Sequence, residues 1–131
     1  MPLRSDWSAA TCPIARSLDV VGDPWLLLVL RESFKGVTRF EQFRSALGIA
    51  DNVLSRRLAQ MVEAGLLRRS PYQAGNNRVQ HEYVLTDAGA DLLPVLCALA
   101  HWGGRHRPAA AGPSCSGGSG EDACVLHLKT R

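Results

Sequence analysis

Side chains that can hydrogen-bond to the edges of nucleic-acid bases recur at helical spacing in one stretch of this chain. Arginine pairs well with guanine, asparagine and glutamine pair with adenine, and serine bonds to a base or a phosphate. The residues of these types are Asn52, Ser55, Arg56, Arg57 and Gln60. On a helix they would lie opposite or beside an apolar face made of Leu54, Leu58, Met61 and Val62. An ordinary solvated helix face would look the same, so the neighbouring segments must decide between the two.

The positive charge of the chain is concentrated around this stretch. The 131 residues carry 15 Lys and Arg against 12 Asp and Glu, a net charge of +3. Residues 39–78 hold seven arginines and three acidic residues, whereas residues 1–38 are neutral and residues 79–131 carry one more acidic than basic group. Because arginine suits bidentate contacts with phosphates and guanine, this distribution indicates a nucleic-acid surface.

Two flanking positions are candidates for contacts with a DNA backbone. Arg39 stands at the start of a predicted helix, where a phosphate would meet its guanidinium and free backbone N–H groups. Arg78 lies with Asn76 and Asn77 at the tip of a predicted hairpin, from which it could enter the minor groove or bind phosphate. The alternative for Arg78 is a solvent-exposed loop residue.

Proline and glycine residues divide the first half of the chain into four short helices. Pro13 and Pro24 each open a helix at its first position, and the second helix is apolar all round and therefore buried. A capping box over residues 38–41 begins the third helix, and Asp51 caps the fourth, which ends near Ala64. The predicted stops are Gly22, Gly36, Gly48 and Gly65.

A hairpin follows the third and fourth helices directly. Its predicted strands are Leu66–Ser70, closed by Pro71, and Val79–Leu85. Two short helices joined by a glycine-containing turn form a helix-turn-helix, and a hairpin after it is a wing. The predicted fold class is therefore mainly α with a small β-hairpin, a winged helix-turn-helix with N- and C-terminal dimerisation helices.

The last predicted helix carries more apolar side chains than a domain of this size can cover. Thr86 caps it, Pro94 kinks it, and it ends at His101 or Arg105. Its apolar residues include Leu92, Leu93, Val95, Leu96, Leu99 and Trp102. Such a surplus indicates a partner surface, here a second copy of the chain. We expect the domain to span residues 7–105 and to be followed by a Gly/Ser/Pro-rich tail over residues 106–131.

Cys12 is the candidate sensor residue. It precedes Pro13 at a helix N-terminus, where the helix dipole favours a thiolate. The alternative is a small capping residue packed at the dimer interface. The other cysteines do not have the spacing of a zinc site, so we predict no metal and no cofactor.

Several classes of protein are excluded by the sequence. The longest apolar run, Trp25–Leu30, is far shorter than the roughly 20 residues of a membrane span. Residues 1–6 lead into no signal peptide. The chain has no Ser/His/Asp arrangement, no carboxylate pair in a setting that would raise a pKa, and no glycine-rich phosphate loop, so we do not expect an enzyme.

Short motifs recur in a fixed order along the domain. They are Cys12-Pro13-Ile14-Ala15, Leu18-Asp19, Val21-Gly22, Pro24-Trp25, Leu27-Leu28, Leu30-Arg31-Glu32, Arg39-Phe40, Phe43-Arg44, Asn52-Val53-Leu54-Ser55, Arg57-Leu58, Glu63-Ala64-Gly65-Leu66, Tyr83, Leu85-Thr86, Ala88-Gly89 and Leu92. In these motifs the chain resembles the HxlR-type winged helix-turn-helix regulators of bacteria, relatives of the MarR group, over about residues 7–104. The resemblance implies a homodimeric, DNA-binding transcription regulator in which a cysteine at position 12 can sense oxidants or electrophiles.

The function expected from these features is sequence-specific regulation of transcription by a bacterial, nucleoid-associated cytoplasmic protein. A homodimer would bind double-stranded DNA at a pseudo-palindromic operator, with half-sites about 10 base pairs or a multiple apart. It would act as a repressor that an oxidant, an electrophile or a small ligand releases. The alternative is a weakly specific architectural DNA-binding protein.

Overall fold

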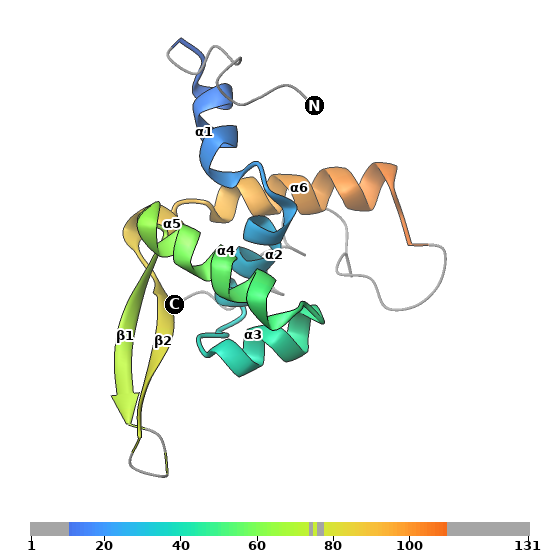
Figure 1. The fold of residues 1–131 in the computed structure, drawn as a ribbon. Helices are drawn as coiled ribbons and strands as arrows, with labels where there is room; N and C mark the ends of the chain where they lie inside the picture. The colour runs from blue at the N-terminus through green and yellow to red at the C-terminus, as the bar shows by residue number, and fades with distance from the viewer. Residues whose placement is uncertain (1–10, 74, 76–77, 110–131) are drawn as a thin grey trace.

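The computed structural model describes residues 11–73, 75 and 78–109 (Figure 1). The elements in chain order are α1 (Pro13–Val21), α2 (Pro24–Phe34), α3 (Phe40–Leu47), α4 (Asp51–Glu63), β1 (Leu67–Gln73), β2 (Val79–Leu85), α5 (Asp87–Ala90) and α6 (Leu93–His106). The predicted fold class, mainly helical with one antiparallel hairpin, is confirmed. The start of the predicted domain at residue 7, the wing residues Asn76 and Asn77, and the tail from residue 110 lie outside the described residues.

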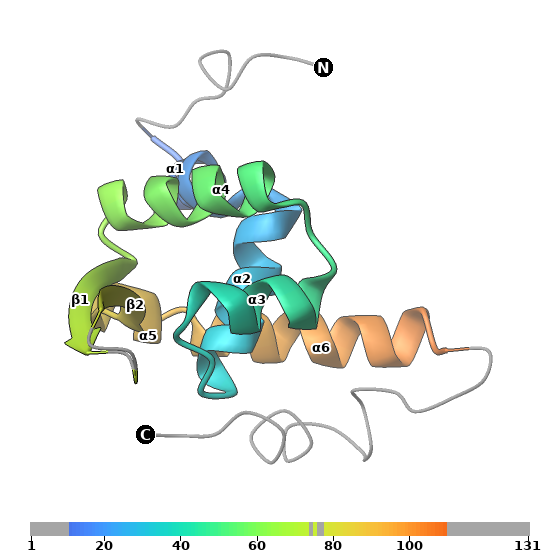
Figure 2. The same ribbon diagram turned by 60° about the horizontal axis from the view of Figure 1, so that its bottom comes forward.

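Helix α2 is the central helix of the fold, as its uniformly apolar sequence predicts. It is opened by Pro24 and capped by Asp23, whose Oδ1 accepts the backbone N–H of Trp25 at 2.9 Å. Val29 and Leu30 are fully buried, and α2 lies between α4 and α6 (Figure 2). Helices α1, α3, α4 and α6 therefore pack around α2, which holds α4 in place from behind.

The start of α3 differs from the predicted capping box over residues 38–41. The N-cap is Arg39, and the Gln42 side chain accepts the backbone N–H groups of Thr38 at 3.3 Å and Arg39 at 3.2 Å. Thr38 is drawn toward β2 instead: its hydroxyl donates to Glu82 at 2.8 Å, and its carbonyl accepts the N–H of Tyr83 at 2.7 Å. The prediction was wrong because a contact from the hairpin competes for the threonine.

The start of α4 also differs from the prediction. Ala50 is the N-cap and makes no side-chain bond, whereas Asp51 is the first helical residue. The Asp51 carboxylate lies 3.4 Å from the Arg44 guanidinium of α3, so it pairs across the turn instead of capping its own helix. Gly48 closes α3 in the left-handed region at φ +61°, as its position predicts.

The wing is longer than predicted because β1 continues through Pro71. The antiparallel register runs from Leu67 opposite Leu85 to Gln73 opposite Val79, with Pro71 opposite His81. A proline lacks a backbone N–H, but β1 pairs only with β2 and has an outer edge where no donor is needed. The strand therefore tolerates Pro71 and brings Tyr72 into the wing.

The predicted long C-terminal helix is divided into two. The Thr86 hydroxyl accepts the N–H of Gly89 at 3.1 Å and caps the short α5. A side chain at Gly89 would collide with the carbonyl oxygen of Leu66, so α5 can lie directly on the base of the hairpin. Helix α6 then begins at Leu93, and Pro94 occupies its first turn, where a missing N–H disrupts no bond. The predicted kink is therefore absent.

Apolar side chains remain exposed on the first and last helices. The core includes Leu26, Leu54 and Leu58, whereas α1 buries only Val21 and α6 only Leu96. Figure 1 shows α1 and α6 both projecting from the body of the domain. The exposed apolar residues on these two helices have relative exposures of 38–72%. They are Ile14, Leu18, Val20, Val95, Leu99 and Trp102. Within the described residues, no helix is long and apolar enough to cross a bilayer.

Candidate nucleic-acid interface

Helix α4 has one buried and one exposed face, divided as its sequence predicts. Leu54, Leu58 and Met61 are fully buried against α2 and α3. The opposite side exposes four polar side chains, which we call the polar face of α4: Asn52, Ser55, Arg56 and Gln60. Together with α3, this arrangement is a helix-turn-helix whose second helix offers hydrogen-bonding groups to a groove.

Arg57 does not share the environment of the polar face. Its side chain is only 20% exposed, and its Nε lies 2.9 Å from Oδ2 of Asp23, just before α2. Sequence reasoning placed Arg57 beside the DNA-contacting residues because it flanks the exposed side of the helix. The structure instead places its guanidinium against the first turn of the central helix.

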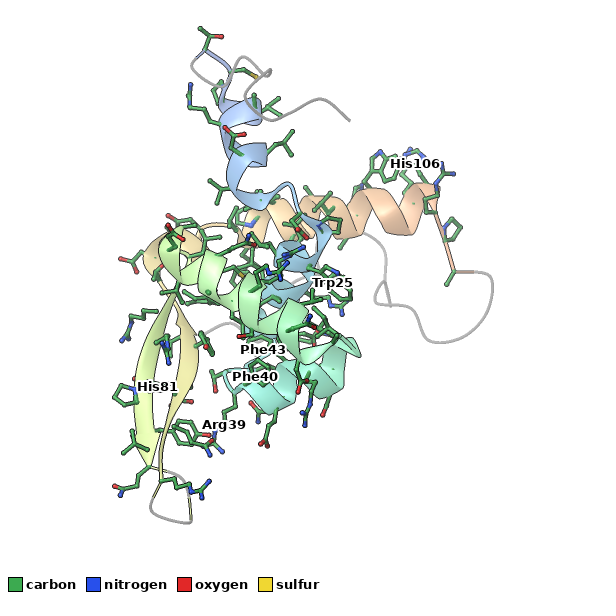
Figure 3. All side chains as sticks on the ribbon, viewed as in Figure 1. Trp25, Arg39, Phe40, Phe43, His81 and His106 are labelled. Carbon is green, nitrogen blue, oxygen red and sulfur yellow. The ribbon has the colours of Figure 1, made fainter. Side chains whose placement is uncertain are left out.

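Arg39 stands between the helix-turn-helix and the wing. Its backbone N–H is occupied by Gln42, so that N–H is not free for a phosphate as predicted. Its guanidinium is exposed and lies over the ring of Tyr72, with Cζ 4.2 Å from the ring centroid. Figure 3 shows Arg39 reaching from the start of α3 toward the hairpin. The charge is thus held at the boundary of the two elements by a cation–π contact.

Tyr72 is a residue of this interface that sequence reasoning missed. Its hydroxyl donates to Oε1 of Gln80 at 3.0 Å on the opposite strand, which fixes the ring on the wing. The predicted strand ends at Ser70 and is closed by Pro71, so it does not include Tyr72. The signal that could have found it is the aromatic residue that follows the basic strand, because arginines stack readily on aromatic rings.

The wing exposes further basic residues. Arg69 lies 3.3 Å from Nδ1 of His81 across the hairpin, and its neighbour Arg68 is also exposed. Arg78 is exposed immediately before the first residue of β2. The wing therefore continues the positive charge of residues 39–78 beyond the helix-turn-helix.

Cys12 is the N-cap of α1, as predicted, and carries a free thiol that is half-buried. Cys97 packs against the core and is disulfide-bonded, whereas Cys115 and Cys124 lie outside the described residues. Within the part of the chain that the structure describes, His, Cys, Asp and Glu side chains form no group that could hold a metal. Within the described residues, Cys12 is therefore the cysteine that carries a free thiol.

The tryptophans that the structure describes differ in their surroundings. Trp25 packs against the core, whereas Trp102 is 55% exposed and stacks near His106, with 5.3 Å between ring centroids. Trp7 lies outside the described residues.

Comparison with known proteins matches most of this arrangement. The family model described as HxlR-like helix-turn-helix matches residues 20–111. An uncharacterized HTH-type transcriptional regulator of Mycobacterium tuberculosis H37Rv is 46% identical over 100 residues, covering 76% of this chain and 62% of that protein. A similar regulator of Synechocystis is 40% identical over 89 residues, covering 67% and 64% of the two chains. This chain thus matches less than two thirds of the length of these relatives.

Solved structures show the same fold. The crystal structure of PA1607, a proposed transcription factor, aligns with a TM-score of 0.72 at 42% identity, over 80% of this chain and 72% of that one. The redox regulator HypR in its oxidized form aligns with a TM-score of 0.66 at 28% identity, over 75% and 100%. The family match, the relatives and the exposed polar face of α4 agree. The chain belongs to the HxlR-like helix-turn-helix family and has the helix-turn-helix fold of that family.

Proposed function

We propose that the protein is a sequence-specific repressor that binds a pseudo-palindromic operator as a homodimer. The observation that carries the proposal is the polar face of α4, which presents two amides, a hydroxyl and a guanidinium opposite a fully buried apolar face. These groups match the hydrogen-bonding patterns of bases in the major groove. Arg56 would contact guanine, and Asn52 and Gln60 would contact adenine.

Backbone contacts would come from both sides of α4. Arg39, held over Tyr72, would bind a phosphate beside the wing, and Arg78 with Asn76 and Asn77 would contact the flanking groove or backbone. Contacts of this kind fix the register of a protein on the duplex and carry no sequence information. Base preference would therefore depend on α4, and most of the salt dependence on Arg39 and the wing.

A second copy of the chain would cover the exposed apolar residues of α1 and α6. The two largest of them on α6, Leu99 and Trp102, are 49% and 55% exposed, and Ile14 on α1 is 72% exposed. Side chains of this size stabilise an interface when they are buried, and their exposure in one copy favours self-association. A twofold axis would then place two α4 helices in successive major grooves.

The signal that releases the operator would act at Cys12. A peroxide would be reduced by its thiol: the sulfur bonds to one oxygen, the O–O bond breaks, and sulfenic acid and water form. An electrophile would instead be attacked by the thiolate, and a small ligand is the remaining alternative. Cys12 caps α1, and α1 carries apolar residues of the proposed dimer surface, so modification of the thiol would act next to that surface.

Selection of bound sequences from a random DNA pool, with and without peroxide, tests the proposal. We expect one pseudo-palindromic motif without peroxide and weaker recovery of that motif with it. The dissociation constants for the selected duplex and a scrambled duplex are then compared at one salt concentration. A ratio near one would instead indicate a weakly specific architectural protein. The setting proposed for this activity is chromosomal DNA in the bacterial cytoplasm.

A further inference from the structure

An ion pair joins the middle of α4 to the start of α2. Arg57 Nε lies 2.9 Å from Asp23 Oδ2, and the two side chains are 20% and 24% exposed. The other oxygen of the same carboxylate accepts the N–H of Trp25, which fixes the carboxylate beside the guanidinium. Arg57 Nε is buried and makes no hydrogen bond within the described residues, so the contact with Asp23 is electrostatic. The pair between Arg44 and Asp51 is different, because it is longer at 3.4 Å and its side chains are 47% and 63% exposed.

Asp23 lies at the junction between α1 and the body of the domain. One residue, Gly22, separates the end of α1 from Asp23, and a side chain at Gly22 would collide with the carbonyl oxygen of Leu18. Val21 is the buried residue of α1, and the other apolar residues of that helix are exposed. The direction of α1 therefore depends on this junction. Arg57 of α4 contacts the junction through its ion pair with Asp23.

We infer that Arg57 is a positioning residue rather than a DNA contact. Together with Asp23 it fixes α4 relative to the junction of α1 and α2, and thereby sets how the two α4 helices are presented to the operator. This inference rests on the proposed dimeric, operator-binding function, because only in a dimer does the orientation of α1 determine the spacing of the α4 helices.

Substitution of Asp23 separates this role from a direct phosphate contact, because the two models predict opposite signs. Asp23→Asn removes one negative charge, and asparagine caps a helix as well as aspartate does. A protein that binds phosphates electrostatically binds more tightly when it loses a negative charge. If Arg57 contacts phosphate, its release from Asp23 strengthens binding further. If Arg57 positions α4, its release weakens binding to the operator.

The experiment compares Asp23→Asn, Arg57→Gln and the double variant, with Asp51→Asn as the matched control. The probe is a duplex selected from the random pool by the parent protein. We expect each single variant to raise the dissociation constant about tenfold, and the double variant to be no weaker than the weaker single variant. The dependence of affinity on salt should stay at the parental value. A second selection from the random pool with Asp23→Asn should recover motifs with a wider range of half-site spacings. Asp51→Asn should bind at least as tightly as the parent.

The inference is overturned if Asp23→Asn behaves like Asp51→Asn, or if Arg57→Gln lowers the salt slope by about 0.9, the loss of one phosphate contact. Far-ultraviolet circular dichroism confirms that each variant is folded. A parent without preference for the selected duplex refutes the proposed function and this inference together, whereas variants that match the control refute the inference alone.

Discussion

Replacement of Tyr72 by leucine should weaken DNA binding although Tyr72 itself need not touch DNA. The ring lies 4.2 Å from Cζ of Arg39, whose side chain is exposed. A cation–π contact at an exposed site contributes about 0.5–1 kcal/mol. Without the ring, the Arg39 side chain would be immobilised only when DNA binds. The free energy lost by immobilising it is about as large as that of the cation–π contact. At 1.4 kcal/mol for each factor of ten, the dissociation constant should rise about two- to fivefold.

Tyr72→Phe is the matched control for this prediction. It keeps the ring beneath Arg39 and removes the hydroxyl that donates to Gln80. We expect its affinity to stay within about twofold of the parent, because a single exposed hydrogen bond contributes little to stability. A phenylalanine variant as weak as the leucine variant would assign the effect to the hydrogen bond across the wing.

The assay is fluorescence anisotropy with a selected duplex and a scrambled duplex at several salt concentrations. Arg39→Ala should weaken binding to both duplexes alike and lower the salt slope by about 0.9, as expected for one lost phosphate contact. In the Arg39→Ala background, Tyr72→Leu should have no additional effect, because its role is to hold Arg39. An equal loss on Tyr72→Leu in both backgrounds would refute the reasoning.

Three further predictions concern base preference, dimerisation and sensing. Arg56→Ala should relax the preference at one base position, by about 1–3 kcal/mol. Unlike Arg39→Ala, it should leave the salt slope unchanged. An unchanged selected motif would contradict this prediction. Leu99→Glu should give a monomer in analytical ultracentrifugation and abolish operator binding, whereas Val79→Glu, at a more exposed position on the wing, should stay dimeric. Cys12→Ser should bind the operator like the parent and keep it in the presence of peroxide, and release of the serine variant by peroxide would remove Cys12 from the mechanism.

Local signals were sufficient to predict most helix boundaries. Pro13 and Pro24 begin helices because their fixed φ suits the first turn, and Gly48 ends one because it adopts φ +61° at little cost. These preferences depend on the residue itself and need no knowledge of the fold. The division of α4 into faces was predictable for the same reason, since helical spacing alone assigns Leu54 and Leu58 to one side.

Features that depend on distant residues could not be predicted in this way. The sequence around Thr38 suits a helix cap, but the Thr38 hydroxyl donates to Glu82, which lies 44 positions away in the chain. Pro94 would kink a continuous helix, yet the packing of Gly89 against Leu66 ends α5 first and leaves the proline in the first turn of α6. In both places a tertiary contact overrides a correct local preference.

Arg57 shows why the candidate site was harder to predict than the fold. A helical projection assigns each residue an angle, and Arg57 falls between the buried and the exposed sides of α4. At such an angle, the neighbouring element decides where the guanidinium lies, and here Asp23 at the capped start of α2 lies 2.9 Å from Nε. Composition offered no help, since an arginine in a basic segment suits DNA and a carboxylate equally well. A residue at the edge of a recognition helix should therefore be assigned to DNA only after the carboxylates that face it from the neighbouring helix are known.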